Sequence, residues 1–222
     1  MNMTTAMNIE QARFNMVEQQ IRPWDLVDVE ALDLFMTVKR ELFVAPAYQN
    51  LAFADTQLPL GHGATMLAPK FEARALQAIA LQANERVLEV GAGSGFMAAL
   101  LAARADHVWS VESVPELVAT ARANLSRAGV SNVTVEQGDG LAGLPALAPF
   151  DVIVVSGAVT EIPQALLTQM TVGGRLFAFV AQATTSQAQL VTRKGEASWM
   201  TTSLFEADAE LLKTPAKSTF VF

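Results

Sequence analysis

The stretch VLEVGAGSGF, residues 87–96, sets an apolar run directly before three closely spaced glycines and a second apolar run directly after them. Arg86–Val90 is predicted to be a buried β-strand, and Gly95–Arg104 a helix. Gly91, Gly93 and Gly95 allow a tight turn between these two elements. They also leave the backbone bare at the helix N-terminus, where free N–H groups can face a ligand. Such a turn is typical of Rossmann-like α/β folds, which bind their cofactors at this point.

From Lys70 onward, helical and strand patterns alternate along the chain. This alternation predicts a parallel sheet with helices on both faces. The last two strands follow each other directly and predict an antiparallel hairpin across Lys194-Gly195. We therefore expect a Rossmann-like, doubly wound, mostly parallel seven-stranded sheet. The predicted strands are 86–90, 107–111, 133–136, 150–156, 175–181, 188–192 and 198–206, and the predicted helices are 71–81, 95–104, 115–128 and 163–170.

The residues before Lys70 have a different pattern. Residues 8–53 place apolar side chains at helical spacing, with a break at Arg22-Pro23-Trp24-Asp25, after which Asp25 or Asp28 can cap the second helix. We expect a single domain over residues 1–222. In it, residues 8–69 form an N-terminal helical cap and a lip over the substrate, and residues 70–222 form the cofactor-binding α/β core.

Composition excludes several classes of function. The 222-residue chain has no cysteine, which removes disulfides, thiolate catalysis and zinc–thiolate sites. Its Asp, Glu and His residues show no metal-ligand spacing, so we predict no bound metal. The formal net charge of -7 and the lack of a basic patch argue against nucleic acid as a partner. With no signal peptide and no apolar run of the ~18 residues that a membrane span needs, we expect a cytoplasmic location and no membrane partner.

Carboxylates and glycines near the strand ends indicate which cofactor fits. Glu89 stands two residues before Gly91, and its negative charge suits S-adenosylmethionine, which carries an ammonium and a sulfonium, better than a pyrophosphate. Glu112 follows the first glycine by about twenty residues, where a doubly wound fold presents an acid to ribose hydroxyls. Asp139 can accept a hydrogen bond from an adenine amine, and Gly140 lets the backbone approach the ring. Two alternatives are that Glu89 only bonds to nearby backbone amides, and that the turn binds a dinucleotide, which the G-x-G-x-G spacing disfavours.

With these residues in place, the sequence resembles the protein-L-isoaspartate O-methyltransferase family. The resemblance runs from about Asn15 to Ala181. It implies an S-adenosylmethionine-dependent methyltransferase, with S-adenosylhomocysteine as product, that methylates a carboxylate of an isoaspartyl residue in damaged protein or peptide during protein repair. The segments that carry it are MVEQQIR, VKRELFVAPAYQNLAFADTQLPLGHGAT, VLEVGAGSGFMAALLA, VEQGDGLAGL and FDVIVVSGA.

The substrate loop departs from the family pattern at the position of a serine and at Lys70, where the family often has histidine. The family usually reads T-I-S-x-P there, and the resemblance assigns the catalytic positions to Thr65 and to Leu67, which replaces the serine. His62 and Gly63 belong to the substrate lip, although His62 can also be a packing residue. Thr65, or Ser156 at the end of the fourth core strand, could supply the missing hydrogen bond. Because of Leu67, a methyltransferase with a small-molecule acceptor and a non-catalytic S-adenosylmethionine-binding protein stay open as alternatives. The oligomeric state is not predicted.

Overall fold

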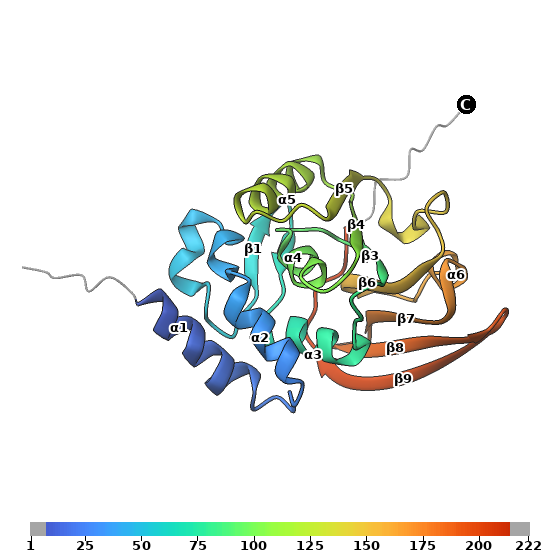
Figure 1. The fold of residues 1–222 in the computed structure, drawn as a ribbon, viewed down its shortest axis with the longest axis horizontal. Coiled ribbons are helices and arrows are strands. Elements are labelled where there is room, and N and C mark those ends of the chain that lie inside the picture. Colours follow the sequence, from blue (N-terminus) through green and yellow to red (C-terminus); the bar gives the residue numbers. More distant parts are fainter. Residues whose placement is uncertain (1–7, 214–222) are drawn as a thin grey trace, which may run out of the picture.

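The computed structural model describes residues 8–213 of the chain. Its centre is a seven-stranded sheet in the order β5-β4-β3-β6-β7-β8-β9 (Figure 1). The neighbours from β5 through β7 pair in parallel, whereas β8 and β9 pair antiparallel. The predicted α/β fold with a C-terminal hairpin is confirmed. The strands are β3 (Arg86–Val90), β4 (His107–Glu112), β5 (Val133–Gln137), β6 (Phe150–Val159), β7 (Met170–Ala181), β8 (Ser186–Gly195) and β9 (Ser198–Ala207).

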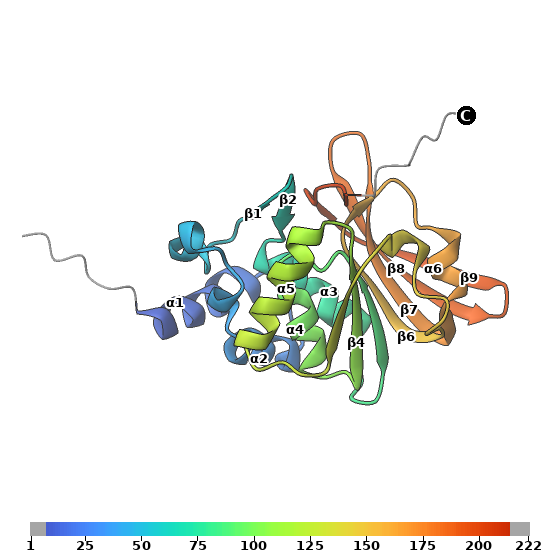
Figure 2. The same cartoon turned by 90° about the horizontal axis from the view of Figure 1, so that it is seen from above.

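Helices cover both faces of this sheet (Figure 2). The helices α3 (Pro69–Ile79), α4 (Phe96–Ala102) and α5 (Pro115–Arg127) lie on one face, and α6 (Gln164–Thr168) lies on the other. Successive residues of a strand therefore join different hydrophobic clusters on the two faces of the sheet. Val87 packs on the side of α4 and Leu88 on the side of α6, each with 0% of its surface exposed. Burial on both faces explains why the strand sequences read as continuous apolar runs.

The N-terminal cap is helical, as predicted. It consists of α1 (Ile9–Asn15), a π-helix (Met16–Ile21), α2 (Val29–Thr37) and two short 3-10 segments, Arg40–Leu42 and Pro46–Leu51. Of the two predicted capping residues, Asp28 caps α2 by accepting hydrogen bonds from the backbone of Glu30 and Ala31. Asp25 lies in the preceding turn with a φ of 54°.

The cap packs on the core next to the glycine turn. The Phe35 ring meets the Phe96 ring edge-on, with 6.0 Å between ring centres, and Phe96 is the first residue of α4. Aromatic pairs of this kind stabilise beyond the area that they bury. The cap therefore rests directly on the helix that follows the predicted cofactor turn.

The lip, expected to be a loop, is a small antiparallel hairpin of β1 (Leu58–Gly61) and β2 (Ala64–Met66). His62 and Gly63 connect the two strands with φ values of 53° and 68°. Two central residues with positive φ define a type I′ turn, whose twist matches that of the flanking strands. The positive φ values of this turn thus explain why glycines flank His62. The strands are too short for a periodic pattern to reveal them.

The C-terminal region differs from the prediction in its boundaries. The strands β8 and β9 are longer than expected and turn at Glu196-Ala197 instead of Lys194-Gly195. They form the long hairpin at the side of the molecule in Figure 1. The strand β7 begins at Met170, where the sequence predicted the end of a helix. A long antiparallel pair holds its backbone hydrogen bonds past the point where the apolar pattern fades.

After β9 the chain returns toward the sheet. We call residues 208–213 the strap. Its backbone bonds to the end of β6, because Ala158 N donates to Glu210 O at 2.8 Å and Leu212 N donates to Ala158 O at 2.9 Å. The lip is attached to it as well, through the Gln57 side chain and Asp208 O. In the part of the chain from residue 8 to residue 213, no helix is both long and apolar enough for a membrane span.

Candidate active site

A crevice opens at the carboxyl ends of β3 and β6, where the strand order reverses. Doubly wound sheets bind ligands at such a switch point because the loops on its two sides diverge. The crevice has a cavity volume of about 60 Å³ and lies between the glycine turn, the lip and the strap. The polar residues that line it include Thr65, Glu112, Ser113, Asp139, Ser156, Glu210 and Lys213.

The glycine turn has the geometry that the sequence predicted. Gly91, Gly93 and Gly95 have φ values of 93°, 51° and 84°, which side chains other than glycine rarely tolerate. Gly95 is the N-cap of α4. Gly140 is required for a different reason, since a Cβ atom there would lie 2.6 Å from a Val90 methyl carbon. The glycines therefore determine the shape of the crevice, because side chains at these positions would be strained or would clash with their neighbours.

Two predicted cofactor-binding carboxylates line the crevice and are held by backbone N–H groups. Glu112 is 6% exposed and accepts hydrogen bonds from Gly93 N and Val114 N, both at 3.0 Å. Asp139 accepts from Leu141 N at 3.1 Å and starts a short 3-10 turn. Because backbone donors fix both side chains, their remaining acceptor positions have defined directions.

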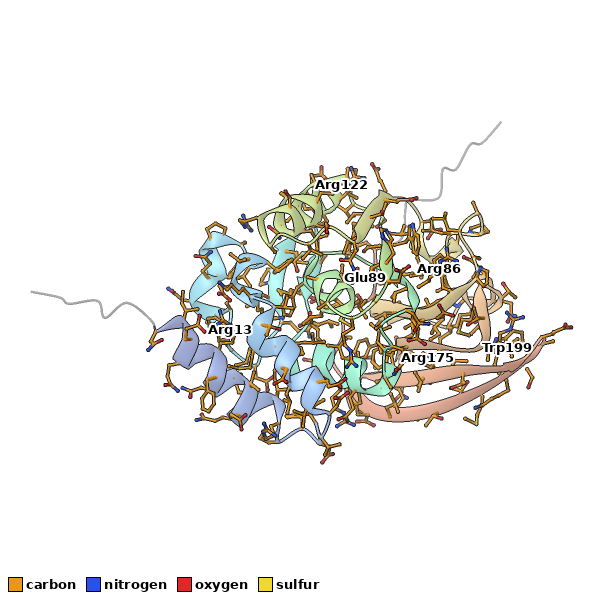
Figure 3. All side chains as sticks on the ribbon, in the orientation of Figure 1. Arg13, Arg86, Glu89, Arg122, Arg175 and Trp199 are labelled. Carbon is orange, nitrogen blue, oxygen red and sulfur yellow. The ribbon has the colours of Figure 1, made fainter. Side chains whose placement is uncertain are left out.

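Glu89 lies deeper than these two residues. It is fully buried near the middle of the molecule (Figure 3) and lines a second, smaller cavity under the lip. Its carboxylate accepts hydrogen bonds from the hydroxyls of Ser110, at 2.5 Å, and Ser156, at 2.9 Å. Burial raises the pKa of the Glu89 carboxyl group to about 8, although the two serine hydroxyls lower it. Its partners are therefore hydroxyls and not the backbone amides of the alternative prediction.

The predicted acceptor residues are close together in the structure. Thr65, Leu67 and Ser156 all line both cavities. The Thr65 hydroxyl donates to the Gln57 side chain at 3.2 Å, and the Ser156 hydroxyl donates to Glu89. Leu67 is 7% exposed, so the position of the family serine is an apolar wall between the crevice and the deeper cavity.

His62 and Gly63 are not among the residues that line either cavity. They form the exposed tip of the β1–β2 hairpin, where His62 Nδ1 is 4.0 Å from a Glu116 carboxylate oxygen. Gly63 lies against the Lys213 side chain of the strap. The turn geometry accounts for both residues, and a direct contact with substrate stays a prediction.

Two features of the site were not predicted from the sequence. The first is the strap, whose Leu212 side chain lies against Gly91 and Gly157 inside the crevice. The second is a buried ion pair between Arg40 of the cap and Glu72 of α3, beneath the lip. The ion pair of Glu72 could have been suspected from the sequence, because Glu72 occupies a buried position of an amphipathic helix, where a charged side chain requires a partner.

The described residues of the site can bind a ligand and fix its position through hydroxyls and carboxylates. Within the described residues, no group of three or more His, Cys, Asp or Glu side chains could hold a metal ion. The main features of the geometry are a bare glycine turn, carboxylates held by backbone N–H groups, and a hydrophobic cover. They suit a reaction in which the two reactants are brought together and water is excluded.

Known proteins match this chain over most of its length. The family model for protein-L-isoaspartate(D-aspartate) O-methyltransferase matches residues 12–207. A protein-L-isoaspartate O-methyltransferase of Burkholderia cenocepacia is 41% identical over 198 residues, which are 87% of this chain and 63% of that protein. This chain therefore spans less than two thirds of that relative. One of Methanoculleus marisnigri is 42% identical over 184 residues, 82% of this chain and 84% of that protein.

Solved structures agree on the fold. A Plasmodium falciparum chain, described as a protein-L-isoaspartate O-methyltransferase and crystallised with S-adenosyl-L-homocysteine, superposes with a TM-score of 0.80. It is 21% identical, and the match covers 93% of this chain and 99% of that one. A second protein-L-isoaspartate O-methyltransferase structure has a TM-score of 0.77 at 25% identity, over 92% of this chain and 65% of that one.

Proposed function

We propose that this chain, which belongs to the protein-L-isoaspartate O-methyltransferase family, transfers a methyl group from S-adenosylmethionine to a carboxylate of damaged protein or peptide. The observation that carries the proposal is the crevice itself. A glycine turn with three positive φ values, two backbone-held carboxylates and the family's lip enclose one space at the switch point of the sheet. The acceptor we favour is the free carboxylate of an isoaspartyl residue.

The residues of the crevice fit this cofactor. Gly91 and Gly93 present backbone without side chains, and Gly140 packs its backbone so closely on Val90 that no side chain fits there. We assign Glu112 to the ribose hydroxyls and Asp139 to the adenine amine, because each keeps an acceptor position beyond its backbone hydrogen bond. Neither residue suits a pyrophosphate, which carries the same charge as they do.

S-adenosylmethionine supplies an electrophilic methyl group on a positively charged sulfur. The acceptor carboxylate is already ionised at neutral pH, since its ordinary pKa is about 4, so the chain needs no general base. What the chain must do is hold the acceptor oxygen in line and keep water out. Leu60 and Leu67 of the lip serve the second purpose, because their side chains cover the space above the glycine turn.

The second candidate function differs in the acceptor. Leu67 stands at the position of the family serine, and the hydroxyls of Thr65 and Ser156 are already engaged with Gln57 and Glu89. This observation favours a less polar acceptor, such as a small molecule with an apolar group beside its methylated atom. A third candidate is an S-adenosylmethionine-binding protein without catalysis.

A radiolabelled methyl-transfer assay separates these functions. We expect label on a peptide with one isoaspartyl residue and none on its aspartyl twin, and the label should be released by mild base, as a methyl ester is. Absence of label, with calorimetric binding of S-adenosylhomocysteine intact, would reject the isoaspartyl function but keep the cofactor site. The variant Leu67→Ser then decides the acceptor, because activity that appears only in this variant means that the natural acceptor is a different molecule.

A further inference from the structure

The ion pair of Arg40 and Glu72 lies between the cap, the lip and the core. Arg40 is 1% exposed and Glu72 is 3% exposed, and Arg40 Nη1 is 2.5 Å from Glu72 Oε2. Arg40 belongs to the 3-10 segment Arg40–Leu42, and Glu72 to the first turn of α3. The pair thus joins two segments on opposite sides of the lip in the sequence.

The other groups of the Arg40 guanidinium are engaged too. Its Nη2 donates to Leu67 O at 2.7 Å, and its Nε donates to Ala52 O at 3.0 Å. The centre of the guanidinium lies 4.9 Å from the centre of the Phe96 ring, in a cation–π contact. One side chain therefore contacts the cap, the lip backbone at the family-serine position, and the helix after the glycine turn.

From these contacts we infer that Arg40 is a positioning residue for methyl transfer, which holds the lip backbone at Leu67 over the glycine turn while Glu72 keeps its guanidinium in place. The role in methyl transfer rests on the proposed function, whereas the restraint of the lip by Arg40 does not. Leu67 and Glu72 both line the small cavity under the lip, so a shift of the Leu67 carbonyl changes the space offered to the acceptor.

Stability is a weak reason for a chain to keep such a pair. Removing two charges from water is costly, and a buried ion pair often contributes no more than apolar residues of similar volume. The cost of burial is visible here, since burial raises the pKa of Glu72 to about 7 despite the neighbouring Arg40. What an apolar pair could not provide is the directed hydrogen bond to Leu67 O. A lysine could not reproduce it together with the other contacts, because it lacks the planar fork.

The cap contains a matched control. Arg13 is also 1% exposed, is 2.5 Å from a Glu41 carboxylate oxygen and lies over the Phe53 ring (Figure 3 shows its place in the cap). Its hydrogen bonds go to Glu10 and Glu41, and neither belongs to the lip. Replacing Arg13 should therefore remove the ion pairs of an equally buried arginine without releasing the Leu67 carbonyl, although the partner carboxylates of Arg13 are more exposed than Glu72.

The test compares Arg40→Lys with Arg13→Lys. Amide hydrogen exchange in residues 58–68 is measured with saturating S-adenosylhomocysteine, and kcat and KM are measured with the isoaspartyl peptide. We expect about tenfold faster exchange of the lip and a 10- to 100-fold loss of kcat/KM in Arg40→Lys only, on the order of what small misplacements cost. Both variants should lose thermal stability, and both should bind S-adenosylhomocysteine within about threefold of wild type.

Equal lip exchange in the two lysine variants would overturn the inference, and so would faster exchange with unchanged kcat/KM. If Arg40→Lys does not fold, the double variant Arg40→Met, Glu72→Met replaces the pair by apolar side chains of similar volume and should give the same faster exchange. An inactive wild type would reject the isoaspartyl function alone, because the exchange comparison then still decides whether Arg40 restrains the lip.

Discussion

Glu89 is fully buried and borders the cavity under the lip, so its charge state affects the stability of the fold. Its ordinary pKa of 4.5 is raised by burial to about 8. Between these two pH values the unfolded chain has lost the proton that the folded chain keeps. The proton on Glu89 therefore contributes to the free energy of unfolding in full below its ordinary pKa, and this contribution is lost as the pH rises through about 8.

We predict that the free energy of unfolding falls between pH 5 and pH 8.5, by on the order of 1–3 kcal/mol. Burial also raises the pKa of Glu72, to about 7, so Glu72 contributes in the same direction at the lower end of this range. Glu89→Gln should remove most of the fall above pH 7, as urea titrations at several pH values would measure. A fall of the same size in Glu89→Gln would contradict the prediction, and the exposed Glu116→Gln is the control.

The residues that sequence reasoning found are those that carry a local signal. Glu112 ends a strand, and Gly91 and Asp139 closely follow strands. A parallel sheet brings the carboxyl ends of its strands to one edge. Arg40 and Leu212 carry no such signal. Their roles depend on which distant segments pack beside them, and a single sequence does not encode that in any local pattern. The hydroxyl partners of Glu89 were missed for the same reason, since Ser110 comes from the neighbouring strand.

His62, at the turn of the β1–β2 hairpin, could contact substrate or only shape the turn, and a substitution separates these two roles. In a type I′ turn the first central residue must adopt a positive φ, and asparagine tolerates this better than histidine does. We predict that His62→Asn keeps kcat/KM within about twofold and leaves stability equal or slightly higher. Loss of kcat/KM by tenfold or more, with unchanged stability, would instead assign His62 a contact with substrate.

The strap gives a second prediction at the scale of an element. Leu212 lies against Gly91 and Gly157 in the crevice, whereas its neighbour Leu211 borders the same crevice but is 53% exposed. Two backbone hydrogen bonds to Ala158 and one from the Ser113 hydroxyl to Lys213 O hold the strap in place. Loss of the Leu212 side chain removes its apolar contact with the floor of the crevice, so the strap should open more often.

We predict that Leu212→Ala releases S-adenosylhomocysteine about tenfold faster than wild type, while Leu211→Ala stays within about twofold. Stopped-flow displacement or surface plasmon resonance would measure both dissociation rates. Equal rates in the two variants would mean that the strap does not restrain the cofactor.

Element types were predicted better than element ends. The sheet strands had long apolar runs, and the helices α3 to α5 had clear periodicity, so both were found. The β1–β2 hairpin was missed because its strands contain three or four residues each. The start of strand β7 was missed because Gly173 and Gly174 interrupt its apolar pattern. The strand is irregular there: Gly173 has a φ of 87°, and the pairing with β6 passes from Met170 to Arg175 across a register irregularity.

At the scale of the whole molecule, the cap and the core share one hydrophobic interior. A single cluster of buried side chains includes Met16 and Phe35 of the cap together with Phe96 and Val108 of the core. Both Phe35 and Phe43 contact the Phe96 ring. A cap with its own interior could unfold alone, but one that completes the interior of the core should unfold with it.

Three tryptophans allow this cooperativity to be measured, because Trp24 lies at the break within the cap, Trp109 on β4 and Trp199 on β9. Variants that keep only Trp24 or only Trp109, with phenylalanine at the other two positions, should show coincident urea transitions by fluorescence. Replacing a buried phenylalanine by alanine lowers the free energy of unfolding by about 3–5 kcal/mol. Adding Phe35→Ala to both variants should therefore move both transitions to lower urea by the same amount. We expect this result because Phe35 packs on Phe96 of the core, so its loss should destabilise the cap and the core together. An earlier Trp24 transition, or a shift of the Trp24 transition alone, would show that the cap is a separate unit and that the lip could open by local unfolding of the cap.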